Sequence, residues 1–206
     1  MQTKLKQSER VAVFCGARPG VQREYTDFAR EFGRSIARRG LDLVYGAGGV
    51  GVMGAVAAGV LDGGGTVTGV IPRSLHERER ADNAPGGVFV VRSMHERKAL
   101  MYRLSSAFAV LPGGIGTLDE LMEVATWNQL SLMRKPIVVV NHRGFFTPML
   151  AMLDHLVAEG FLSEQERGLV QVADTAEEAL DRLGHPEPTG SAAALPVPAA
   201  TAAVPA

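Results

Sequence analysis

Short apolar, β-branched segments alternate along this chain with longer segments of helical periodicity, and this alternation restricts the possible folds more than any other feature. Strands are predicted at residues 10–16, 41–46, 66–72, 88–92, 107–112, 136–141 and 169–174. Helices are predicted at residues 25–40, 51–64, 94–106, 117–130, 147–160 and 175–183. Because each strand is apolar throughout, helices must cover both faces of the sheet. The pattern predicts a single α/β domain with a Rossmann-like, doubly wound parallel sheet.

The predicted folded domain, residues 10–185, lies between two segments of different composition. Residues 1–9 form a polar N-terminal extension without the apolar stretch of a signal peptide. Residues 186–206 are rich in Ala and Pro and contain no Lys or Arg. Such a composition cannot bury enough apolar surface to fold, so we expect a disordered tail.

Composition excludes several classes of function. Among 206 residues the formal net charge is −1, which argues against nucleic-acid binding. Cys15 is the only cysteine, so no intramolecular disulfide or cysteine-rich metal site can form. The five histidines lack the spacing of metal ligands, and neither a metal nor a cofactor is expected. No apolar run approaches the roughly 20 residues of a membrane span, so the predicted location is the cytoplasm, away from membranes.

Three glycine-rich turns follow predicted strands: "CGARPG" (15–20), "YGAGGVGVMG" (45–54) and "LPGGIGTLDE" (111–120). Ligands of such folds bind at the carboxyl ends of the strands, so all three turns could face one cleft. Backbone N–H groups and the helix dipole at a strand–helix turn favour a phosphate. The second turn is not a dinucleotide fingerprint, since it follows the second strand and lacks the later acidic residue. Tight strand–helix packing remains the alternative explanation of each turn.

Two charged pairs stand beside these turns. We expect Thr117 to cap the helix that starts near it, with Asp119 and Glu120 in the first turn. Acidic residues there can simply complement the helix dipole. Arg97 and Lys98 lie near the start of the helix 94–106, where the dipole disfavours cations. This placement suggests an anionic ligand, and a surface charge pair is the alternative.

The segments "SMHERKALM" and "LPGGIGTLDELMEVATWNQL" resemble the paired signature of the LONELY GUY (LOG) family, R-K and P-G-G-x-G-T-x-x-E. The resemblance covers about residues 10–183. It implies hydrolysis of the N-glycosidic bond of an adenosine 5′-monophosphate, with or without an N6 modification. The products would be a free adenine-type base, a cytokinin when N6-modified, and ribose 5-phosphate. It further implies a homodimer whose active site is shared between subunits.

The resemblance also implies roles for individual residues. Arg97 and Glu120 match the catalytic pair, and Lys98 matches its companion at the substrate. The phosphate loop would consist of Gly113, Gly114, Gly116 and Thr117. Two further positions match residues that contact substrate in relatives, namely Glu79 and Thr126. The chain departs from the family after the first "CG", where Ala17 and Arg18 replace small hydroxyl residues.

Two other functions remain open at this point. A non-catalytic nucleotide or phosphate carrier, like the related molybdenum cofactor carrier proteins, would keep the glycines without needing Arg97 and Glu120 together. Amino-acid decarboxylation, an old label of the family, is poorly supported because Lys98 has no recognisable pyridoxal phosphate context.

Overall fold

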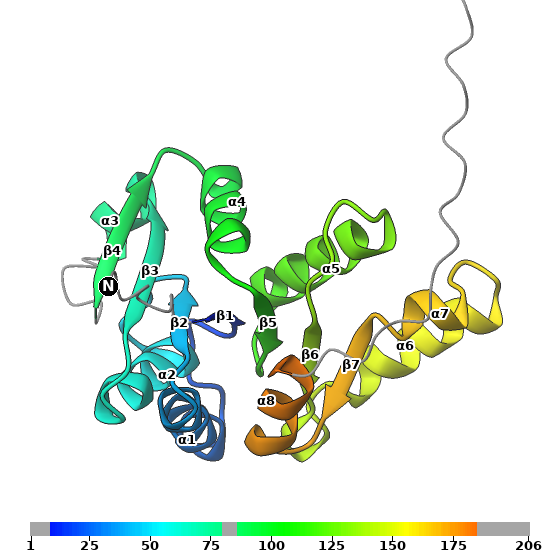
Figure 1. Ribbon diagram of the computed structural model, residues 1–206, viewed down its shortest axis with the longest axis horizontal. Helices are drawn as coiled ribbons and strands as arrows, with labels where there is room; N and C mark the ends of the chain where they lie inside the picture. The colour runs from blue at the N-terminus through cyan, green and yellow to red at the C-terminus, as the bar shows by residue number, and fades with distance from the viewer. Residues whose placement is uncertain (1–8, 80–85, 185–206) are drawn as a thin grey trace, which may run out of the picture.

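The computed structural model describes residues 9–79 and 86–184, with residues 77–79 described by their backbone alone (Figure 1). Its centre is a seven-stranded sheet in the order β4-β3-β2-β1-β5-β6-β7, in which every neighbouring pair is parallel. The strands are β1 (Arg10–Phe14), β2 (Asp42–Tyr45), β3 (Val67–Pro72), β4 (Gly87–Val91), β5 (Ala107–Val110), β6 (Ile137–Val140) and β7 (Val170–Ala173). The predicted doubly wound α/β domain is therefore confirmed. The predicted extension, apart from Glu9, and the predicted tail lie outside the described residues.

Helices pack on both faces of the sheet. One face is covered by α1 (Glu24–Arg38), α2 (Gly51–Asp62) and α8 (Ala176–Gly184). The other face is covered by α4 (Met94–Leu104), α5 (Ile115–Gln129) and α6 (Thr147–Ala158). Three shorter helices complete the described ranges of the chain, α3 (Arg73–Glu79), the 3₁₀ helix η2 (His142–Gly144) and α7 (Glu164–Arg167). None of the helices in the described ranges has the length and apolarity needed to cross a membrane.

Side-chain alternation along β1 shows how one strand serves two cores. Val11 and Val13 pack with α1 and α2, whereas Ala12 and Phe14 pack with α4 and α5. All four side chains are at least 98% buried. Successive strand residues point to opposite faces of a sheet, so a strand that is apolar at every position requires helices on both sides.

Every predicted strand and helix is present, with each boundary within two residues of the prediction. The strands β1 and β5 end two residues earlier than predicted, because the residues that follow leave the ladder to form the turns of the site. The helix α3 was not predicted, since residues 73–79 are mostly polar. Leu75 supplies the apolar contact, against a small cluster around Ala47 and Ile71.

The strand order reverses between β1 and β5. The chain proceeds from β1 outward to β4, then returns to the other side of β1 with β5 and continues to β7. Loops after β1 and β5 therefore run to opposite sides and leave a crevice at the carboxyl edge of the sheet. The candidate site lies at this switch point.

Candidate active site

The turns after β1 and β5 pack directly against each other. The N–H of Gly16 donates to the carbonyl of Pro112 at 3.0 Å. A Cβ on Gly16 would lie 3.3 Å from the Cα of Gly113, and a Cβ on Gly113 would overlap Oγ1 of Thr117. The close approach of the two turns therefore requires glycine at position 113 and leaves little room for a side chain at position 16.

The start of α5 differs from the predicted start, and the difference matters for anion binding. The helix begins at Ile115 with Gly114 as its N-cap, so Thr117 is not the cap and the first turn holds no acidic residue. Glu120 instead lies in the second turn. Space is open within 4 Å of a Cβ built on Gly114 or Gly116. The N-terminal N–H groups and the positive end of the helix dipole are thus accessible to an anion.

The turn after β2 contributes differently from the other two. A Cβ on Gly46 would overlap Nη2 of Arg97, so Gly46 makes room for the guanidinium. A Cβ on Gly48 would come within 3.1 Å of the Met53 sulfur. Of this segment, only Val52 and Met53, at the start of α2, line the cavity. For the glycines of this turn, close packing is the better explanation.

Arg97 and Glu120 face each other from α4 and α5. Their side chains are each 9% exposed, and Nη2 lies 3.8 Å from Oε1. That distance is beyond a hydrogen bond, and Nε of Arg97 is buried without a partner among the described residues. The remaining contact of Nη1 is weak, 3.8 Å from the sulfur of Met94. The guanidinium thus has unused donors, which is costly unless a ligand accepts from them.

The environment of Glu120 favours the protonated form. Burial raises the pKa of Glu120 to about 7, the charge of Arg97 opposes this rise, and Asp119 adds to it. Because its pKa lies near neutral pH, this carboxylate can accept or donate a proton under physiological conditions.

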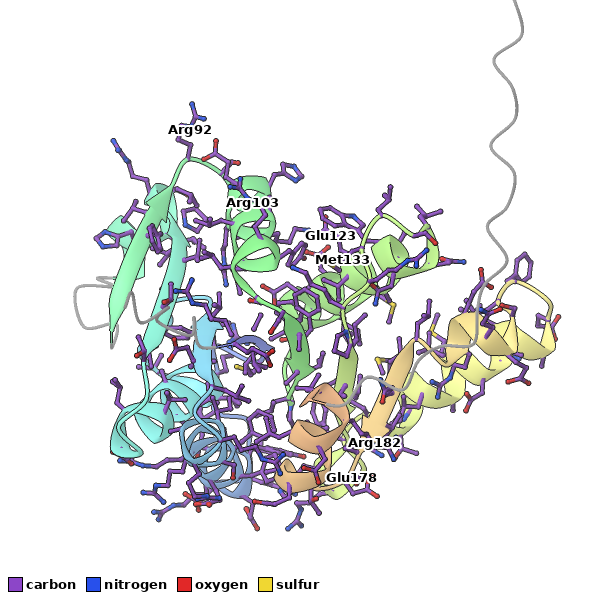
Figure 2. All side chains as sticks on the ribbon, viewed as in Figure 1. Arg92, Arg103, Glu123, Met133, Glu178 and Arg182 are labelled. Carbon is purple, nitrogen blue, oxygen red and sulfur yellow. The ribbon has the colours of Figure 1, made fainter. Side chains whose placement is uncertain are left out.

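Lys98 is held by carboxylates on α5. Its Nζ lies 3.0 Å from Oδ2 of Asp119 and 3.0 Å from Oε2 of Glu123. The hydroxyl of Tyr102 donates to the same Glu123 oxygen at 2.6 Å. Figure 2 shows Glu123 between α4 and α5. Burial lowers the pKa of Lys98, but the hydrogen bonds to Glu123 and Asp119 outweigh this effect, so the pKa lies above its ordinary value. The ammonium therefore stays charged and bound to these two carboxylates.

A cavity of about 640 Å³ joins these groups. Its lining includes Arg97, Lys98, Gly113, Gly114, Gly116, Thr117 and Glu120, so the structure brings seven of the nine predicted site residues together. Thr126 does not line it, since its hydroxyl is exposed on α5 and donates to the carbonyl of Met122 at 2.7 Å. The side chain of Glu79 lies outside the described residues.

Several cavity residues were not predicted. Tyr25 on α1 and Phe145 after β6 meet edge to face, with ring centroids 5.6 Å apart. Met53 and Met94 also line the cavity. Cys15 is 1% exposed at the cavity wall. Cys15 and Met53 belong to glycine-rich turns after strands, and this position was the only sequence signal that they line the site. No sequence signal links Tyr25 with Phe145.

The fold and site together define a Rossmann-like α/β protein with an anion-binding helix terminus and a buried Arg–Glu pair at the switch point of its sheet. Residues 53–183 match the family model described as "Possible lysine decarboxylase". The chain belongs to the LOG family. It is 47% identical over 174 residues to the cytokinin riboside 5′-monophosphate phosphoribohydrolase LOG of Oryza sativa subsp. japonica, covering 84% of this chain and 72% of that protein.

A second relative agrees with the family assignment, and a solved structure agrees with the fold. The cytokinin riboside 5′-monophosphate phosphoribohydrolase LOG4 of Arabidopsis thaliana is 45% identical over 174 residues, covering 84% of this chain and 81% of that protein. A solved structure of the molybdenum cofactor carrier protein of Chlamydomonas reinhardtii superposes with a TM-score of 0.67. That alignment covers 86% of this chain and 97% of the carrier at 22% identity, which supports the fold alone.

Proposed function

We propose that this protein hydrolyses the N-glycosidic bond of an adenosine 5′-monophosphate, with or without an N6 modification. The products are a free adenine-type base, which is a cytokinin when the substrate is N6-modified, and ribose 5-phosphate. Membership of the LOG family supports the reaction class. The observation that carries the proposal is a buried carboxylate with a pKa of about 7, Glu120, less than two helical turns after an open helix N-terminus.

The geometry suggests how the reaction proceeds. The 5′-phosphate binds at the N-terminus of α5, among Gly113, Gly114, Gly116 and Thr117. This places the ribose toward Glu120. As the bond between C1′ and the base breaks, positive charge develops on the ribose, and the ionised Glu120 stabilises it. The same carboxylate accepts a proton from the water that attacks C1′, while the electron pair of the broken bond leaves with the base. The departing base takes up a proton and Glu120 gives up the one it accepted, so that neutral base and ribose 5-phosphate are released and the carboxylate is restored.

Arg97 provides the positive charge that faces Glu120 during this step. Its guanidinium keeps part of the Glu120 population ionised and offers unused donors to the ribose hydroxyls or the phosphate. Lys98 acts through Asp119 and Glu123, because both carboxylates already bind its ammonium. A direct contact of Lys98 with substrate stays a prediction.

Homodimerisation with a shared active site is part of the proposal. Three apolar side chains on α5, Ile115, Leu118 and Met122, recur at helical spacing with exposures of 88%, 36% and 37%. Thr126 continues the spacing on the same helix and does not line the cavity of its own chain. If a second copy packs on this stripe, Thr126 can reach the partner's cavity, which accounts for the substrate contact implied by the resemblance.

Decarboxylation of lysine is disfavoured by the state of Lys98. A Schiff base requires an unprotonated amine, usually obtained by lowering the pKa of a lysine. Here the pKa of Lys98 is raised and two carboxylates bind its ammonium. Lys98 is also the single lysine among the described residues that line the cavity.

A non-catalytic carrier is the alternative function, since such a protein needs the glycine turns without Arg97 and Glu120 acting together. Purified protein incubated with AMP and with N6-isopentenyl-AMP distinguishes the two. Release of free base and ribose 5-phosphate, detected by chromatography and lost in Glu120→Gln, supports the hydrolase. Binding of both nucleotides without release would establish a carrier. The predicted cytoplasmic location is checked separately by cell fractionation.

A further inference from the structure

The charged side chains that line the cavity do not all have counter-charges. Lys98 is bound by Asp119 and Glu123, and Arg97 faces Glu120. Arg18, in the turn after β1, is the third cation of the lining. Its side chain is exposed, and it forms no ion pair or hydrogen bond within residues 9–79 and 86–184. Arg18 is thus the one cation of the lining that pairs with no carboxylate among the described residues.

The backbone that carries Arg18 is held on two sides. The N–H of Gly16 donates to Pro112, and the carbonyl of Gly16 accepts from the N–H of Met53 at 3.0 Å. The carbonyl of Ala17 lies so close to Gly51 that a Cβ there would overlap it. The turn is therefore anchored to the β5 turn and to the start of α2, while the side chain of Arg18 is free to move.

An anion at the start of α5 needs more positive charge than that turn supplies. The open N-terminus offers N–H groups and roughly half an elementary charge. The phosphate of a nucleoside monophosphate carries between one and two negative charges near neutral pH. Arg97 is shared with Glu120, and Lys98 is occupied, so neither supplies the missing charge in full.

We propose that Arg18 binds the 5′-phosphate of the substrate, closing from the β1 turn over the phosphate held at the N-terminus of α5. A guanidinium suits this role because its planar donors match phosphate oxygens in pairs. Arg18 thereby favours 5′-monophosphates over nucleosides that lack the phosphate. The inference rests on the proposed function in taking a nucleoside 5′-monophosphate as the ligand.

The test compares Arg18→Ala and Arg18→Lys with Arg23→Ala as the matched control. Arg23 is an exposed arginine five residues further along, pairs with Asp27 at 3.4 Å and does not line the cavity. Binding of ribose 5-phosphate is measured by calorimetry, and turnover of AMP by release of free adenine. Melting temperatures check that each variant is folded.

In Arg18→Ala we expect the Kd for ribose 5-phosphate and the KM for AMP each to rise about 10- to 100-fold, the range of a charged hydrogen bond. The kcat should change less than about threefold, because the phosphate contact is made equally in ground and transition states. Arg18→Lys should recover part of the affinity, since it keeps the charge without the planar fork. Arg23→Ala should match the wild type.

Either of two binding results overturns the inference, and so does one kinetic result. One is a Kd for ribose 5-phosphate in Arg18→Ala within about twofold of Arg23→Ala, which would make Arg18 an ordinary surface charge. The other is failure of the wild type to bind ribose 5-phosphate. If the wild type binds ribose 5-phosphate through Arg18 but releases no base from nucleotides, the phosphate contact stands and the proposed hydrolysis fails. If the Arg18→Ala variant hydrolyses AMP as well as the wild type does, the hydrolysis stands and the phosphate contact fails.

Discussion

Gly46 and Arg97 occupy adjoining space, such that a Cβ at position 46 would overlap the Nη2 atom of Arg97. The glycine follows β2 and the arginine lies on α4, so the contact joins segments about 50 residues apart. The guanidinium it accommodates is the one that faces Glu120. A small residue at the end of one strand thus determines where a charged group of the site can lie.

We predict that Gly46→Ala lowers kcat/KM at least tenfold, because the added methyl group displaces the guanidinium of Arg97. Steady-state kinetics measure the change, and Gly87→Ala is the control, since a Cβ at Gly87 meets nothing within 4 Å. Wild-type activity in Gly46→Ala, with Arg97→Ala inactive, would show that the guanidinium can shift without loss.

The activity should depend on the protonation of Glu120. Its pKa of about 7 means that the ionised form declines below neutrality, so kcat/KM should fall about tenfold per pH unit below about pH 7 and level off above it. The phosphate of the substrate adds a further decline near its own pKa of about 6. A rate profile that stays flat between about pH 6 and pH 8 would contradict the assigned role.

The ionised form of Glu120 should lower the free energy of unfolding. Its folded pKa of about 7 lies above the ordinary value of 4.5, so the stability it contributes is full below about pH 4.5 and is lost as the pH rises through about 7. We expect Glu120→Gln to raise the free energy of unfolding by roughly 3 kcal/mol at about pH 8 and to change it little at about pH 4.

Urea denaturation at the two pH values measures this difference. Asp181→Asn provides a matched control, because its side chain is 63% exposed on α8, away from the cavity. Destabilisation by Glu120→Gln at about pH 8 would mean that attraction to Arg97 outweighs the cost of burial.

Lys98 provides a test of indirect action on Glu120. Its positive charge lowers the pKa of Glu120, whereas the carboxylates of Asp119 and Glu123 raise it. Lys98→Met should therefore shift the acid limb of the rate profile upward, by about half to one pH unit. A tenfold rise in KM with an unmoved limb would instead indicate direct binding of the substrate by Lys98.

The exposed stripe on α5 predicts a dimer. Met122→Lys should convert the protein from dimer to monomer and reduce activity at least tenfold, because a charge enters an apolar interface and separates Thr126 from the partner's cavity. Light scattering coupled to gel filtration measures the assembly. Met152→Lys is the control, as Met152 is 63% exposed on α6, outside the stripe. A monomeric wild type with full activity would refute the shared site.

The local pattern of residues was enough to predict the seven strands, the six longer helices and the parallel sheet. Periodicity and strand-wide apolarity are properties of neighbouring residues, and helices on both faces follow from them. The resemblance in "SMHERKALM" and "LPGGIGTLDE" predicted that Arg97 and Glu120 act as a pair. In the structure, Nη2 of Arg97 lies 3.8 Å from Oε1 of Glu120. The helix α3 was missed because its polar residues carry almost no periodic signal.

Tertiary structure alone decided the relations between distant segments. The strand order sets β1 beside β5, which brings Gly16 against Gly113 and creates the switch point. It also joins Tyr25 to Phe145 and gives Lys98 its carboxylate partners. The pKa of Glu120 depends on burial by these packed elements, a quantity that no short stretch of sequence contains. Local residue patterns were thus enough to predict which elements form and which residues are candidates for the site. The packing of distant segments sets which of these residues meet, and therefore their charge states.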